Sequence, residues 1–180
     1  QQCADLEHRK AHRGAAVSLA YLPEHAENAL LALDMAEKES AHLAYTHRTL
    51  FACTIDIEWV RALVRREDLS EKIDAFVSRF GRLQDHIGEK LIPRFAALLG
   101  SEPKSLLDNL AYAEKAGWLN SAEAFVSARK LRNLLVHEYV AEAELFLESL
   151  QAADEATRML MDIVTRLEQQ ARALGLVESR

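Results

Sequence analysis

The segment from Arg132 to Tyr139 contains the side chains of this chain that are best suited to chemistry. It carries a guanidinium at Arg132, an amide at Asn133, an imidazole at His137 and a phenol at Tyr139. These groups suit the cleavage of RNA, because an imidazole that titrates near neutral pH can move the proton of the 2′-hydroxyl or of the leaving oxygen. The guanidinium would hold the phosphate oxygens while charge builds up, and Asn133 would orient the phosphate or the imidazole. This scheme requires no carboxylate cluster, so we expect neither a metal ion nor a cofactor.

The spacing of these residues limits how one helix can use them. At about 100° per residue, Asn133 and His137 lie about 40° apart on one stripe, and Arg132 and Tyr139 lie about 20° apart on an adjacent stripe. Arg132 and His137 are about 140° apart. The long Arg132 side chain, an irregularity in the helix or a second subunit must therefore bring the two groups to one phosphate.

The composition predicts that helices position this segment. With 180 residues, of which 49% are hydrophobic, the chain is long enough for one core and too short for two comfortable ones. Only 6 Gly and 3 Pro are present, whereas sandwiches, barrels and doubly wound sheets need turn residues at short intervals. We therefore expect a single all-α domain whose first and last helices are long.

Hydrophobic periodicity and helix-capping residues predict where the helices lie. The spacing over 26–63 predicts one long helix or two in line, and a second helix is expected to begin at Ser70 and to kink or end at Pro93. Pro103 is placed to open a short helix that ends near residue 116. Asn120, with Glu123 three residues later, has the form of a reciprocal cap for the helix that carries Arg132. The last helix is expected to reach Leu174.

The distribution of charge allows a local basic groove in an acidic protein. The net charge of −6 excludes a generally polycationic nucleic-acid binder. The segments 61–94 and 120–140 nevertheless contain more basic than acidic residues. If the two segments pack together, their arginines could line one groove; otherwise they are scattered, solvated charges. The residues concerned are Arg61, Arg65, Arg79, Arg82, Arg94, Arg129 and Arg132.

Other polar residues give weaker indications. His42 and His47 have a poor spacing for a metal site on one helix, so we interpret them as ordinary satisfied or exposed histidines. Asp85 and His86 could face the same cleft as Arg132, but a surface or helix-packing role is favoured. The two cysteines, Cys3 and Cys53, have no Cys or His nearby at ligand spacing.

Hydrophobic residues and their distribution complete this picture. Trp59 and Trp118 are expected in the core or at a dimer contact, and Phe125 and Leu131 in the core. No stretch is long and apolar enough for a membrane span, and no secretory pattern is seen at the N-terminus. A cytoplasmic protein is therefore expected.

The Arg-x4-His-x-Tyr pattern of Arg132, His137 and Tyr139 resembles the signature of HEPN domains, and specifically that of HepT, the toxin of the HepT–MntA toxin–antitoxin pairs. The segment from Phe80 to Leu91, with its Gly-Arg-Leu-Gln-Asp run, is similar to the upstream helix of HepT-like proteins. The resemblance covers 41–174, which would be the antiparallel HEPN helical bundle. Residues 1–40 would be a helical extension of unknown role, and 175–180 a tail.

The resemblance implies a role for each residue of the motif. Arg132 and His137 would be the pair that cleaves RNA, with Asn133 as their polar neighbour and with Arg129 and Arg82 supporting RNA binding. Tyr139 would be the hydroxyl that an MntA-like nucleotidyltransferase antitoxin modifies with AMP, as in a type VII-like pair. HEPN domains dimerise so that two motifs face one cleft, which would bring Arg132 and His137 groups together. A homodimer or higher oligomer is thus expected.

Two other interpretations of the motif remain open. In the first, the chain is a catalytically silent HEPN module, the nucleotide-binding or substrate subunit of a nucleotidyltransferase complex. Arg132, His137 and Tyr139 would then recognise a nucleotide. In the second, the chain is a helical dimerisation protein in which the motif occurs by coincidence. Toxicity on expression and cleavage of RNA distinguish the nuclease from the binding module.

Overall fold

The computed structural model describes residues 20–137 and 142–178, and these residues form helices and no strand, which confirms the all-α prediction. Short helical turns also occur at η1 (Pro23–His25) and η2 (Leu63–Arg65), and a π-helical turn, η3, spans Ile87–Leu91. The α-helices are α1 (Ala26–Leu50), α2 (Ile57–Ala62), α3 (Glu67–His86), α4 (Ile92–Leu98), α5 (Leu106–Lys115), α6 (Ala122–His137) and α7 (Ala143–Ala173).

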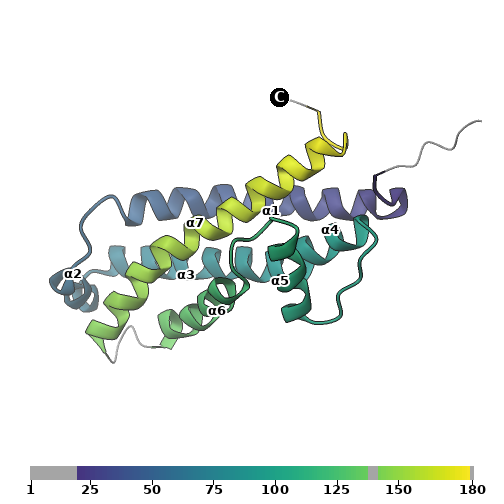
Figure 1. Ribbon diagram of the computed structural model, residues 1–180. Helices are drawn as coiled ribbons and strands as arrows, with labels where there is room; N and C mark the ends of the chain where they lie inside the picture. The colour runs from purple at the N-terminus through teal and green to yellow at the C-terminus, as the bar shows by residue number, and fades with distance from the viewer. Residues whose placement is uncertain (1–19, 138–141, 179–180) are drawn as a thin grey trace, which may run out of the picture.

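The long helices form an elongated bundle (Figure 1). The helix α1 lies antiparallel to the continuous rod formed by α3, η3 and α4, and α7 crosses in front of both. The helix α6 packs against α3 and α7, and α5 packs against α4 and α6. The first and last helices, with 25 and 31 residues, are the longest, as the periodicity predicts. The helix that carries Arg132 is therefore held between α3 and α7.

Aromatic side chains fill the core between these helices. Phe76 and Phe80 of α3, Phe95 of α4 and Phe125 of α6 are all fully buried. Each such burial contributes about 1.5–3 kcal/mol, so these rings fix how α6 sits on the α3–α4 rod. Trp118 is also buried, as predicted.

Two other residues expected in the core are less enclosed. Trp59 and Leu131 are only partly buried, although both pack against the core. Leu131 lies on the side of α6 that faces α7, where it lines a shallow groove between the two helices.

The domain boundary expected at residue 40 falls inside α1. Ala29, Leu33 and Ala36 are buried in the same core as the rest of the bundle, so 26–40 pack as part of it. Residues 1–19 of the expected extension, and 179–180 of the tail, lie outside the described residues. The span 26–63 contains two helices, because the chain leaves α1 after Leu50 and Asp56 caps α2 by accepting a bond of 2.8 Å from the Trp59 N–H.

The rod that carries α3 begins earlier than the sequence indicates. It starts at Glu67, and the Ser70 hydroxyl donates to the carbonyl of Leu63 at 3.0 Å instead of capping the helix. The preceding Arg66 bonds the carboxylate of Asp68 in the first turn, and this hydrogen bond holds the pKa of Asp68 below its usual range. The helix α3 therefore begins without a side-chain cap among the described residues.

Pro93 neither ends nor breaks the rod. It lies in the first turn of α4, directly after the π-helical turn η3. A proline in a helix clashes with the carbonyl four residues earlier, which here belongs to Glu89 within that wider turn. The π-helical turn therefore gives this carbonyl space, and the rod continues to Leu98.

The helices α5 and α6 begin three residues and one residue later than predicted. Leu106, not Pro103, is the first residue of α5, and the preceding Ser105 forms a reciprocal cap with Asp108. The helix α6 follows Ser121, whose hydroxyl accepts from the Ala124 N–H at 3.1 Å, so Asn120 is not its cap. A serine with its short hydroxyl fits these positions equally well, and sequence spacing alone does not decide between adjacent candidates.

Candidate functional site

The side chain of Arg132 rests on the backbone of α3 at Gly81. A Cβ atom placed on Gly81 would lie 2.6 Å from Nε of Arg132, closer than real Cβ atoms come, and 3.1 Å from Cζ, which is tighter than most contacts. A glycine inside a helix costs about 1 kcal/mol relative to alanine. A larger residue at this position would force the Arg132 side chain to shift, so Gly81 leaves space for the guanidinium, and we call this position the seat of Arg132.

Asp85, one turn after Gly81, holds the other side of the guanidinium. Its Oδ2 atom lies 3.1 Å from Nη1 of Arg132, and the two side chains are 33% and 38% exposed. Both groups are thus fixed at the seam between α3 and α6 while remaining open to solvent. The structure places Asp85 with Arg132, whereas the sequence favours a surface or packing role for it.

A cavity of about 260 Å³ opens beside Arg132. Its walls come from α3 and α6, and they combine one cation, one carboxylate and one hydroxyl with apolar side chains. The lining residues are Asp74, Val77, Ser78, Arg132, Leu135 and Val136. A phosphate would be attracted to the Arg132 end of this cavity and repelled from the Asp74 end.

Gln84 lies between Gly81 and Asp85 in sequence but points into the protein. Its side chain is 1% exposed, and neither its Oε1 nor its Nε2 atom has a hydrogen-bond partner among the described residues. A buried polar group without a partner costs about 1–3 kcal/mol. Together with the π-helical turn that begins at Ile87, it makes this part of α3 energetically unfavourable, which is common beside functional sites.

The helix α6 is regular from Ala122 to His137. Position 137 is therefore about 7.5 Å along α6 from position 132 and about 140° around it. An irregularity of α6 between the two residues is excluded, so only the reach of the Arg132 side chain or a second subunit can join them. The side chain of His137 and the whole of Tyr139 lie outside the described residues.

The remaining predicted site residues on α3 and α6 are in part accessible. Asn133 is exposed, one position around α6 from Arg132, and Arg129 is half-buried one turn earlier. Arg82 is exposed on α3, and no ion pair involves it among the described residues. Asn133 and Arg82 thus flank the seat of Arg132 from two helices.

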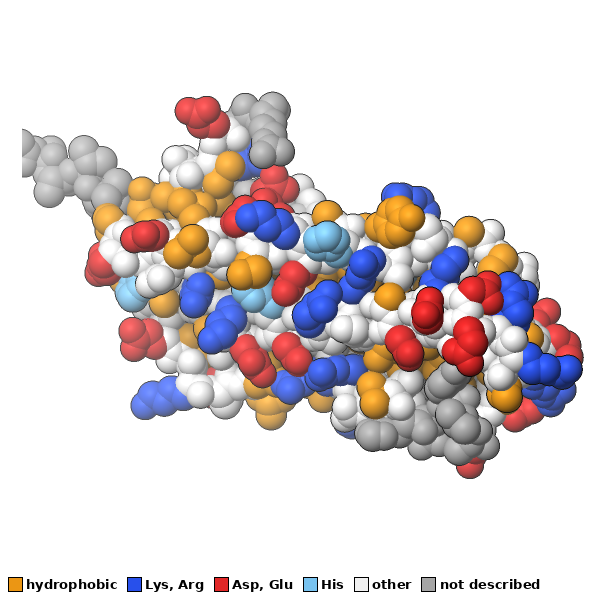
Figure 2. Space-filling view, turned by 180° about the vertical axis from the view of Figure 1, so that it is seen from behind, with side chains coloured by type: hydrophobic (Ala, Val, Ile, Leu, Met, Phe, Trp, Pro, Cys, Tyr) orange, Lys and Arg blue, Asp and Glu red, His pale blue; other side chains and the backbone are white. Residues whose placement is uncertain are grey.

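The predicted groove of seven arginines is not formed. Figure 2 shows basic side chains spread between acidic ones over the face of α1 and α3. Arg61 bonds Glu144 at the far end of the bundle, while Arg79 and Arg94 donate to backbone carbonyls of α1. These bonds hold helices together, and among the described residues Arg132 is the one basic residue that lines the cavity.

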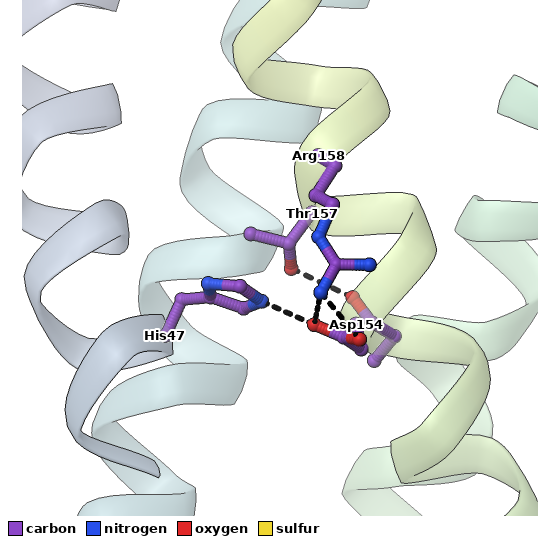
Figure 3. Close-up of polar contacts among 5 residues, drawn as sticks. His47, Asp154, Thr157 and Arg158 are labelled. Atoms are coloured by element: carbon purple, nitrogen blue, oxygen red, sulfur yellow. Dashed lines mark hydrogen bonds and ion pairs between the residues drawn. The ribbon is translucent and has the colours of Figure 1, made fainter. Parts of the chain in front are cut away.

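The predicted histidines also have structural positions. His47 of α1 bonds Asp154 of α7 at 2.6 Å, and Arg158 pairs with the same carboxylate at 2.8 Å (Figure 3). His86 Nε2 lies 2.8 Å from the carbonyl of Ala32, which agrees with a packing role. Among the described residues, no three His, Cys, Asp or Glu side chains are arranged to hold a metal ion.

Sequence reasoning missed what Gly81 and Gln84 do. Gly81 stands inside a strongly periodic helix, where glycine is unfavourable, and this signal could have indicated a close approach by another group. The burial of Gln84 gives no such signal, because a glutamine in a helix is more often exposed. The burial of Gln84 can be recognised only once the packing of α3 against its neighbours is known.

Comparison with known proteins does not identify the chain. No family model matches it, and neither a curated protein nor a solved structure is significantly similar. None of the helices in the described residues is long and apolar enough to cross a membrane. The function must therefore be argued from the site itself.

Proposed function

We propose that this chain is a HEPN-type, HepT-like endoribonuclease that cleaves RNA without a metal ion. The observation that carries the proposal is the seat of Arg132. Gly81 and Asp85 fix a half-exposed guanidinium at a cavity of about 260 Å³, five residues before His137 on one regular helix.

In this mechanism, Arg132 binds the phosphate that is to be cleaved. Its guanidinium donates hydrogen bonds to the non-bridging oxygens, and these bonds strengthen as negative charge grows in the transition state. His137 transfers the proton of the 2′-hydroxyl or of the leaving oxygen. The 2′-oxygen then attacks phosphorus as the bond to the leaving 5′-oxygen breaks.

A second copy of the chain completes the site in this proposal. Because α6 is regular between positions 132 and 137, the two groups lie on different sides of the helix. A homodimer in which two α6 helices face each other would place Arg132 of one copy near His137 of the other. The proposal thus predicts that a monomer cleaves RNA poorly.

Substitution of the histidine tests the proposed activity. We expect His137→Ala to abolish RNA cleavage and to relieve growth arrest on expression, because the proton transfer is lost. His25→Ala is the matched control, because it also removes an imidazole but lies in η1, outside the motif. This variant should cleave RNA as the wild type does. If the purified wild-type dimer cuts no RNA and arrests no growth, the proposal is wrong.

The same proposal includes control by a nucleotidyltransferase that transfers AMP to Tyr139. A nucleotide there would add negative charge and bulk beside Arg132 and repel an RNA phosphate. Coexpression with the nucleotidyltransferase should add the mass of AMP to the wild type and not to Tyr139→Phe. An unchanged adduct on Tyr139→Phe would exclude this residue as the acceptor.

The ion pair of Arg132 with Asp85 favours one second candidate function. A guanidinium that is already partly neutralised by Asp85 could recognise a nucleotide without catalysis. The chain would then be the silent nucleotide-binding subunit of a nucleotidyltransferase complex. Binding of a nucleotide by a wild type that cleaves no RNA would support this candidate.

A further inference from the structure

Among the described residues, three arginines on α1 and α3, namely Arg48, Arg79 and Arg82, have no carboxylate partner, and α1 also carries an exposed tyrosine. The Tyr45 side chain is 60% exposed, and the guanidinium of Arg48 lies over its ring, 5.6 Å from the centroid. Arg79 and Arg82 of α3 have no ion pair among the described residues. By contrast, half of the arginines that the structure describes pair with carboxylates: Arg61, Arg66, Arg132, Arg158, Arg166 and Arg172.

These residues continue the site of Arg132 across the bundle. At about 100° per residue, one side of α3, about 120° wide, carries four of these residues. Going around the helix, they occur in the order Asp85, Ser78, Arg82 and Arg79. Asp85 and Ser78 border Arg132 and its cavity, whereas Arg79 lies at the α1 side of the helix. The exposed surface of α3 therefore leads from the cavity to α1.

Hydrogen bonds fix the end of this path at α1. Nη1 of Arg79 donates to the carbonyl of His42 at 3.1 Å and to Oγ1 of Thr46 at 2.6 Å. Both acceptors lie within one turn of Tyr45. Figure 2 shows basic side chains next to a histidine and hydrophobic side chains in the middle of this face. The guanidinium of Arg79 is thus held in place before any ligand binds.

We propose that Tyr45, Arg48, Arg79 and Arg82, here called the α1–α3 patch, bind single-stranded RNA that extends from the Arg132 cavity. This inference rests on the proposed function, because that function places one end of the bound RNA at the Arg132 cavity. An exposed aromatic ring stacks on a base, and unpaired arginines bind the adjacent phosphates, which is how proteins hold single strands without reading sequence. The bases of a duplex are already stacked on each other, so the patch selects single strands.

Charge argues for RNA over a protein partner at this patch. The four side chains of the patch combine three cations with one aromatic ring, which suits a polyanion that also carries bases. Of the carboxylates on this side of the bundle, Asp34 and Asp85 are paired, with Lys38 and Arg132, whereas Asp74 at the cavity has no ion pair among the described residues. In a chain whose net charge is −6, unpaired cations around an aromatic ring are complementary to a polyanion.

The binding of a labelled single-stranded RNA of about 12 nucleotides, the site size of one such surface, tests the patch. Fluorescence anisotropy is measured with the full-length His137→Ala protein, so that the probe is not cut. We expect Tyr45→Ala to weaken binding about tenfold and Tyr45→Phe, which keeps the ring, to change it less than twofold. Arg82→Ala should weaken binding and reduce its salt dependence, whereas Lys115→Ala on α5 should do neither.

Three results would overturn the inference. Equal binding by Tyr45→Ala and the parent protein excludes a stacking role, and equal weakening for duplex RNA excludes selection of single strands. If Tyr45→Ala leaves RNA binding intact but dissociates a dimer in sedimentation, the patch is a contact between copies. Because the assay measures binding and not cleavage, a protein that binds through Tyr45 but never cleaves refutes the proposed function and leaves this inference standing.

Discussion

Two seams between helices each hold an arginine and an aspartate, but they use them differently. At the α1–α7 seam, Asp154 accepts from Arg158 at 2.8 Å and contacts His47 at 2.6 Å, and the His47 side chain is only 15% exposed. At the α3–α6 seam, the contact between Arg132 and Asp85 is 3.1 Å, and both side chains are about twice as accessible as His47.

The polar groups around the two pairs differ as well. Thr157, beside Asp154, is fully buried and donates its hydroxyl to the Ala153 carbonyl at 2.7 Å, so its bonding capacity is met (Figure 3). Gln84, beside Asp85, is equally buried but has no partner among the described residues. Among the described residues, the α1–α7 seam therefore satisfies its buried polar groups, whereas the α3–α6 seam leaves one buried amide without a partner and its ion pair more open to solvent.

The largest expected effect separates the two arginines. Arg132→Ala should lower RNA cleavage at least about 100-fold, because it removes a charged donor from the transition state, and should change the unfolding free energy little. Arg158→Ala is the matched control, since it also removes an arginine from a pair with aspartate, and it should cleave normally. Single-turnover cleavage and urea unfolding check both variants. Equal losses of cleavage in Arg132→Ala and Arg158→Ala would contradict the proposed difference between the two seams.

The two aspartates should show the reverse contrast. Asp154→Ala leaves His47 and Arg158 without their carboxylate, so we expect the unfolding free energy to fall by about 1–3 kcal/mol with no loss of cleavage per folded molecule. Asp85→Ala, whose partner remains accessible to water, should cost less than about 1 kcal/mol but alter cleavage. Urea titrations of both variants measure the difference. A larger loss for Asp85→Ala would contradict the assignment of the seams.

Gly81→Ala should separate stability from activity within the α3–α6 seam. Alanine is the better helix former by up to about 1 kcal/mol, so the unfolding free energy should not fall. The new Cβ would displace the Arg132 guanidinium, and we expect cleavage to drop about tenfold. Gly88→Ala, whose Cβ would meet Leu106 and Phe125 instead, should lose stability and keep its cleavage rate. Unchanged cleavage by Gly81→Ala would show that Arg132 needs no seat.

The smallest expected effect concerns the unpaired amide. Gln84→Met keeps the approximate shape and removes two buried polar atoms that lack partners, so the unfolding free energy should rise by about 1 kcal/mol. Cleavage should change less than twofold, because the amide does not reach the cavity walls. Thermal unfolding and cleavage assays test this. A destabilised Gln84→Met would mean that the amide is bonded in solution.

Local signals in the sequence predict the helices well but not their exact ends. The periodic stripes give α1, α3 and α7 because burial of one face decides whether a helix forms. Pro93 does not end the helical rod as one of its two predicted effects would have it, since a π-helical turn precedes it and the rod continues into α4. Ser121 rather than Asn120 precedes α6, because both residues can cap and packing selects between them.

The candidate site is predictable in its residues but not in its contacts. The motif singles out Arg132 because the full Arg-x4-His-x-Tyr pattern is uncommon by chance. That Asp85 is its partner, and that Gly81 makes space for it, depends on how α6 crosses α3, which no local pattern encodes. For the same reason, the sequence leaves a basic groove open as an alternative and does not show that Arg79 and Arg94 bond to carbonyls of α1.

The π-helical turn at Ile87–Leu91 holds one more residue than an ordinary turn of the rod would. Such a turn takes one more residue than an α-turn to complete about the same rotation, so deletion of Glu89 would restore a uniform spiral with little change in the direction of Gly81 and Asp85 relative to α4. A deletion in the regular part of α3 would instead rotate the residues before it by about 100° relative to α4. The wider turn thus lets the rod contain one additional residue while its two halves keep their phase, and with it the direction in which the seat of Arg132 opens.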